Sequence, residues 1–166
     1  MCPDSYPDVR KLTPTDAMAG DSAKDTRLLK ESLGEATAFL QRFKWCRQIK
    51  ASYFGLGIGG IVSVFLFEIE PAKAEVDRWL WVVVGDLPPA YLTTDCAPNP
   101  ACALDDYIGA MREWAQAAAG GKSVNGLIPV SAPATPQNGR ELLERLDFLE
   151  KHVLSNFADD LKAGGV

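Results

Sequence analysis

The segment Trp79–Asp95, WLWVVVGDLPPAYLTTD, carries the side chains best suited to acid–base chemistry in this sequence. An apolar strand is expected to end just before Asp86, and the two prolines that follow bend the chain. This bend would bring Asp86, Tyr91 and Asp95 near one edge of a sheet. Paired carboxylates can share acid–base work when their environments separate their pKa values, so Asp86 is the candidate acid/base, with the other two in support. Asp86 can instead cap the turn by accepting hydrogen bonds from backbone N–H groups, and we favour this second interpretation.

A nucleophilic Ser–His or Cys–His pair would have to use His152, the single histidine of the chain. It lies off the apolar stripe of the last expected helix, one turn after Phe148, and no G-x-S-x-G sequence marks a nucleophile. We therefore expect His152 to be an exposed surface residue. Phe148 and His152 together are a candidate interaction surface, although Phe148 could also pack under the preceding loop.

Two glycine-rich segments approach nucleotide-binding motifs without completing them. Residues 55–60, GLGIGG, satisfy G-x-G-x-x-G, but a dinucleotide fingerprint follows a strand and opens a helix, whereas these glycines precede a strand. Residues 120–123, GGKS, resemble the end of a P-loop, but Gln116 occupies the position that requires the first glycine. We expect a hairpin turn and a helix end instead, and no cofactor.

The cysteines Cys2, Cys46, Cys96 and Cys102 form no C-x-x-C pair, and structural zinc needs four Cys or His ligands in tight pairs. No metal site is expected. Free thiols are the simplest interpretation, and pairing of Cys96 with Cys102 would depend on geometry that the sequence does not define.

Charge and hydropathy exclude two classes of partner. The net charge of −5 and a pI near 4.9 argue against nucleic acid, which requires a basic surface. The most basic stretch, Arg42–Lys50, is expected at the end of a helix, where cations suit the dipole. Between Lys50 and Glu68 lie 17 uncharged residues, but a membrane-spanning helix needs about 20 and would not carry four glycines.

The apolar patterning predicts an α+β fold with an antiparallel meander of three to five strands flanked by three helices. Residues 1–25 are expected to be a flexible leader, and residues 26–166 a single domain. The expected elements are a helix over 26–48, strands over 52–58, 61–69, 78–85 and 90–93, and helices over 100–119 and 136–161. Both faces of the second and third strands are apolar, so helices, loops or a partner subunit should cover them. Residues 1–25 show no apolar signal segment, which makes the cytoplasm the expected location.

Three segments resemble a family of small soluble bacterial proteins of unknown function: WLWVVVGDLPPAYL, DCAPNPACALDDYIGAMREW, and LIPV before Thr135-Pro136. The resemblance spans most of residues 27–155. It implies a bacterial cytosolic origin, and it brings no activity and no site residue.

These observations favour a non-catalytic binding or interaction protein that associates with itself or with a protein partner. An acidic chain of this size is compatible with an immunity-like or antitoxin-like role toward a basic partner, because complementary charge accelerates encounter. The alternative is a small-molecule-binding protein or hydrolase-like enzyme, with its site where the Asp86–Asp95 bend meets the loop over 122–136.

Overall fold

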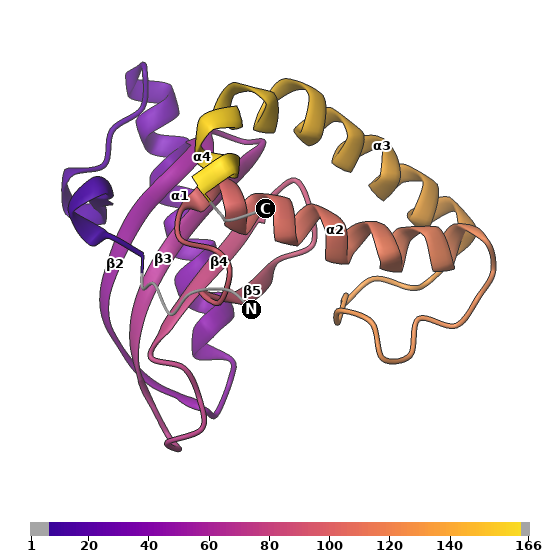
Figure 1. Cartoon of the computed structure of the whole chain (residues 1–166), viewed down its shortest axis with the longest axis horizontal. Coiled ribbons are helices and arrows are strands. Elements are labelled where there is room, and N and C mark those ends of the chain that lie inside the picture. The colour runs from indigo at the N-terminus through magenta and orange to yellow at the C-terminus, as the bar shows by residue number, and fades with distance from the viewer. Residues whose placement is uncertain (1–6, 164–166) are drawn as a thin grey trace.

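The computed structural model of the chain describes residues 7–163, and it has the α+β architecture expected from the sequence (Figure 1). The long helices are α1 (Ala23–Gln41), α2 (Pro100–Ala119) and α3 (Pro136–His152). The strands are β1 (Thr13–Pro14), β2 (Cys46–Ile58), β3 (Val62–Pro71), β4 (Trp79–Gly85) and β5 (Ala90–Thr93). The short elements are η1 (Val9–Lys11), η2 (Thr15–Ala17), η3 (Leu154–Phe157) and α4 (Ala158–Ala163).

The five strands form one antiparallel sheet in the order β1-β2-β3-β4-β5. Each strand pairs with its neighbour in sequence, which confirms the predicted meander. Gly59 and Gly60 make the turn between β2 and β3, where Gly60 has φ +81°, so the glycine-rich segment is a hairpin. Among residues 7–163, no helix is long and apolar enough to cross a membrane.

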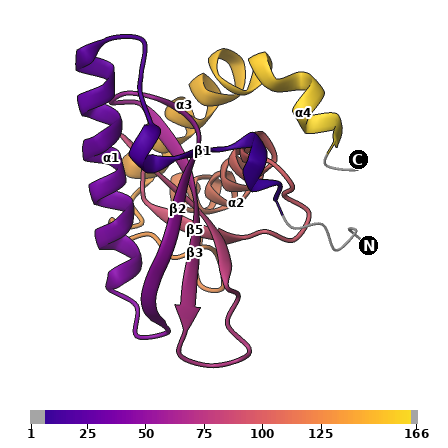
Figure 2. The same ribbon diagram turned by 90° about the vertical axis from the view of Figure 1, so that its left-hand side faces the viewer.

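Helices of the same chain cover both faces of the sheet. Figure 2 shows α1 on one side and α2 with α3 on the other. On the α1 face, Leu29, Ala36 and Leu40 pack against alternate residues of β3 and β4, including Phe65 and Val82. The opposite alternation on these strands faces α2, and fully buried Trp81 donates a hydrogen bond to the Ala97 carbonyl there at 2.9 Å. The predicted cover of both faces is therefore supplied without a partner subunit.

Helix α3 packs against α2, on the side of α2 that lies away from the sheet (Figure 1). At Gly139 the two helices approach so closely that a Cβ would lie 2.5 Å from the Ala115 carbonyl oxygen. Asn99 caps α2 and Thr135 caps α3, each followed by proline, as expected from the sequence.

Two predicted helix ends are wrong. The first helix stops at Gln41 rather than Gln48, because the chain turns at residues 42–45 and Cys46 pairs with Pro71 as the start of β2. The basic stretch Arg42–Lys50 therefore belongs to a turn and to the first residues of β2. The last long helix ends at His152 rather than Leu161, since the chain turns there and packs Val153, Leu154 and Phe157 into the core beside α2.

Part of the predicted leader contributes to the domain. Thr13 and Pro14 pair with Phe54 and Tyr53 of β2, and Met18 is buried against the α1 face. Residues 1–6 lie outside the described residues, and the flexibility of the leader stays a prediction. Cys46 and Cys102 are free thiols, as expected, whereas Cys96 is disulfide-bonded, which differs from the prediction.

Candidate functional site

The structure separates the residues that the sequence placed together at the Asp86–Asp95 bend. Asp86 and Asp95 lie before and after β5, and both are exposed. The Asp86 carboxylate lies 3.7 Å from the Arg145 guanidinium of α3. Tyr91 faces the side of the sheet that α1 covers, because it pairs with Val82, whose side chain packs under α1.

Tyr91 belongs to an aromatic cluster at the C-terminal end of α1. The rings of Phe43 and Trp45 stack with centroids 4.8 Å apart. The Tyr91 ring meets them edge to face at 5.3 and 4.9 Å, and Phe39 meets Phe43 in the same way at 5.2 Å. These distances are those of rings in direct contact, so the rings fill the space between them. The cluster is therefore a packed wall and not an open cage for a cation.

A groove opens beside this cluster, with a volume of about 420 Å³. Three segments that are distant in sequence line it: the end of α1, strand β5 with the residue before it, and the loop between α2 and α3. We call it the aromatic groove, and its lining residues are Phe39, Arg42, Phe43, Pro89, Ala90, Tyr91, Ile128, Pro129 and Ser131. A mostly apolar lining with one charge and two hydroxyl groups is typical of a site that binds an apolar group and orients it.

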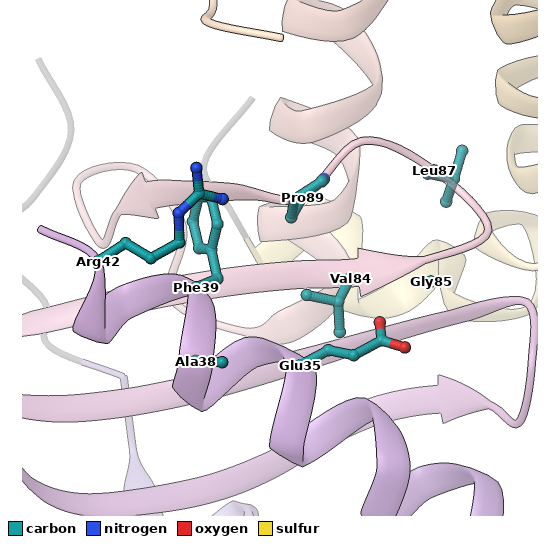
Figure 3. Close-up of a pocket in the computed structure, with 8 residues that line it drawn as sticks. All are labelled: Glu35, Ala38, Phe39, Arg42, Val84, Gly85, Leu87 and Pro89. Carbon is teal, nitrogen blue, oxygen red and sulfur yellow. The ribbon is translucent and has the colours of Figure 1, made fainter. Parts of the chain in front are cut away.

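A second cavity of about 290 Å³ adjoins the groove and shares Phe39, Arg42 and Pro89 with it. Figure 3 shows that the Glu35 side chain extends toward Gly85, whereas Arg42 extends beside the Phe39 ring. Within residues 7–163, the Arg42 guanidinium forms no ion pair. The groove therefore presents one positive charge that is available to a ligand.

The bend that forms part of the groove wall is held from the opposite face of the sheet. The fully buried side chain of Tyr107, in α2, donates a hydrogen bond from its hydroxyl to the Pro88 carbonyl oxygen at 2.5 Å. Burial raises the pKa of this phenol above its ordinary value, so the donor stays protonated across the neutral range. This bond positions Pro89 and Ala90 at the groove.

Phe148 and His152 lie away from the groove, on the outer side of α3. Their rings are in contact, with centroids 4.8 Å apart, and Phe148 is 45% exposed. His152 is exposed, as the sequence predicts. Neither residue lines the aromatic groove or the cavity that adjoins it.

The sequence prediction placed Tyr91 beside Asp86 and did not bring it together with Phe39, Arg42 and Phe43, which line the same groove. The available signal was Trp45, which falls outside the apolar stripe of the first helix and so needed another contact. Among residues 7–163, no cluster of three or more potential metal ligands is present.

Comparison with protein-family models, curated proteins and solved structures finds no match to this chain. The resemblance to a family of small bacterial proteins accordingly stays a prediction.

Proposed function

We propose that this chain is a non-catalytic binding protein, and that its ligand or partner inserts an apolar group into the aromatic groove. The proposal depends on the groove itself. Three chain segments line it, and they contribute apolar side chains and, within residues 7–163, one arginine that forms no ion pair. Transfer of water from an exposed apolar groove to bulk solvent is favourable, so the free energy of the system falls when an apolar group fills the groove.

The arrangement of the candidate catalytic groups supports binding over turnover. A general acid or base must reach the reacting atom, yet Asp86 and Asp95 do not line the groove. The groove contributes one hydroxyl from Ser131, one phenol from Tyr91 and one guanidinium from Arg42. These groups can donate hydrogen bonds and orient a ligand. The bacterial origin and cytoplasmic location expected from the sequence remain part of the proposal.

Two matched variants test the groove. Tyr91 is 39% exposed and Phe148 is 45% exposed, so Tyr91→Ala and Phe148→Ala each remove one partly exposed ring, from the groove and from the α3 surface respectively. We expect a protein or small molecule captured by the tagged wild-type chain from its native lysate to be lost with Tyr91→Ala and retained with Phe148→Ala.

Circular dichroism and thermal unfolding of both variants establish that the fold is kept. The reverse pattern, with capture lost only in Phe148→Ala, would reject the groove and assign binding to the α3 surface. Equal capture by all three proteins would also reject it.

A further inference from the structure

Within residues 7–163, strand β5 leaves one edge of the sheet open, directly at the aromatic groove. Among the strands of residues 7–163 it is the last in the sheet, and it pairs there with β4 alone. On its outer side, the backbone of Ala90–Thr93 makes no hydrogen bond within the described part of the chain. Unpaired N–H and C=O groups along an extended edge are a template for another strand.

The opposite edge of the sheet is protected, which makes the openness of β5 a specific feature. Strand β2 has irregular register at three places along its pairing with β3, and β1 covers Tyr53 and Phe54. The exposed charges of Arg47 and Lys50 also lie on β2. Bulges, charges and a covering strand are the usual means of blocking edge pairing. Strand β5, with the sequence AYLT, pairs in regular register and carries no charge.

The walls of the groove favour a single extended segment beside β5. Phe39 and Phe43 border it from the α1 face, and Ile128 and Pro129 border it from the α2–α3 loop. Side chains alternate along a strand, so every second residue of an added strand would face α1, as Tyr91 does. One such side chain would enter the aromatic groove.

The positive charge of Arg42 adds a second requirement for the molecule that occupies the groove. Arg42 lines the groove and the adjoining cavity, and it has no carboxylate partner within residues 7–163. A carboxylate near this guanidinium would form a charge-assisted hydrogen bond. An occupant with an acidic side chain or a terminal carboxylate beside its apolar residue therefore fits both features.

From these features, and building on the proposed binding function, we propose that the groove binds an extended peptide of a partner protein. The peptide adds a sixth strand to the sheet along β5. It places one large apolar side chain between Phe43 and Ile128, and a carboxylate at Arg42. Main-chain hydrogen bonds to β5 supply affinity, while the groove selects the side chain.

A peptide accounts for the groove better than a second copy of the chain. A copy pairing through its own β5 would bring its α1 and its α2–α3 loop to the same edge, where α1 and the loop of the first copy already stand. A single strand meets no such obstacle, because it brings no covering layers.

The test uses peptides selected from a random dodecapeptide display library on the wild-type chain and counter-selected on Tyr91→Ala. Selected sequences are synthesised, and binding is followed by fluorine NMR of protein labelled with 5-fluorotryptophan. Trp45 touches Tyr91 in the cluster, and Trp45→Phe identifies its signal among the four tryptophans. We expect a large apolar residue near an acidic one in the selected peptides, and a shift of the Trp45 signal.

Two N-methylated forms of each peptide, methylated at odd or at even positions, test strand addition. An added strand pairs with β5 through alternate residues only, so one form should lose at least about tenfold in affinity and the other should bind nearly unchanged. Arg42→Gln should weaken the unmethylated peptide about tenfold. The matched control Arg47→Gln removes an exposed charge on the opposite edge and should leave affinity unchanged.

Equal affinity of the two methylated forms would overturn strand addition and leave the groove as a simple pocket, consistent with the proposed function. A selection that yields no peptide dependent on Tyr91 would overturn the peptide as ligand. The lysate capture with Tyr91→Ala judges the proposed function separately. A β5-mediated dimer, seen by sedimentation and abolished by Leu92→Lys, would assign the edge to a second copy and also overturn the proposal.

Discussion

At the scale of single residues, Gly85 has the clearest requirement for its residue type. Its φ of +149° is a conformation that residues with a side chain rarely adopt. A Cβ at this position would overlap the Ile61 carbonyl group, which also accepts a hydrogen bond from the Asp86 N–H at 3.1 Å. Gly85 therefore allows β4 to pass close to the β2–β3 turn before the chain bends toward the groove.

We predict that Gly85→Ala lowers the free energy of unfolding by about 2–4 kcal/mol, because it combines an unfavourable φ with a backbone overlap. The matched control is Gly109→Ala, in an exposed part of α2 where a Cβ meets nothing within 4 Å. That variant should raise the free energy of unfolding by about 0.5–1 kcal/mol, since alanine favours helix. Urea unfolding measures both. A Gly85→Ala protein as stable as the wild type would show that the bend tolerates a side chain.

Residue types also limited what the sequence could reveal about the site. The bend after β4 was predictable, because glycine and two prolines interrupt an apolar run. The partners of Tyr91 were not, because Phe39, Phe43 and Ile128 come from segments whose contact with β5 depends on the packing of whole elements. Asp86 had the residue type for acid–base chemistry, but its ion pair with Arg145 depends on where α3 lies.

At the scale of elements, alternation and capping predicted the core of the fold. The apolar faces of β3 and β4 and the caps of α2 and α3 follow from local sequence, and the structure confirms them. The two wrong helix ends lie where local helix propensity competes with contacts distant in sequence. Cys46 pairs with Pro71 instead of extending α1, and Leu154 turns into the core instead of continuing α3.

The hydrogen bond from Tyr107 to Pro88 joins α2 to the bend at the groove, and its contribution to stability should depend on pH. Burial raises the pKa of the Tyr107 phenol in the folded state above the ordinary value of about 10. At a pH below about 10 the phenol is protonated in both the folded and the unfolded state, and the hydrogen bond makes its full contribution to the free energy of unfolding. Above that pH the unfolded chain releases the proton first, so the free energy of unfolding falls as the pH rises.

We therefore predict that Tyr107→Phe costs about 1–2 kcal/mol at neutral pH, because the Pro88 carbonyl loses its donor. The difference from the wild type should shrink as the pH rises past about 10, because the variant lacks this ionisation. Urea unfolding of both proteins at a series of pH values measures the difference. A difference that stays constant into the alkaline range would show that Tyr107 ionises in the folded protein as it does in the unfolded chain.

At the scale of the whole molecule, helices of the same chain cover both faces of the sheet, which removes one argument for self-association. The sequence suggested a partner subunit because both faces of the central strands are apolar. Helix α1 covers one face and α2 covers the other, with residues such as Phe67 and Trp81 fully buried (Figure 2). Self-association stays a prediction, and the apolar faces of β3 and β4 no longer support it, because helices of the same chain cover them.

The net charge of −5 is a property of the whole molecule, and it affects the association rate of a partner protein more than the dissociation rate. A basic partner is steered by long-range attraction, which salt screens, whereas an apolar side chain in the groove is released at a rate that salt changes little. We predict that raising the salt concentration slows association of the captured partner by a larger factor than it speeds dissociation, because only the carboxylate paired with Arg42 makes dissociation depend on salt. Tyr91→Ala should do the opposite, speeding dissociation with little effect on association.

Surface-based kinetic measurements on the captured partner, at low and high salt, separate the two effects. A partner whose association rate is independent of salt would refute charge steering while leaving the groove intact, and recovery of the chain alone would point to a homo-oligomer.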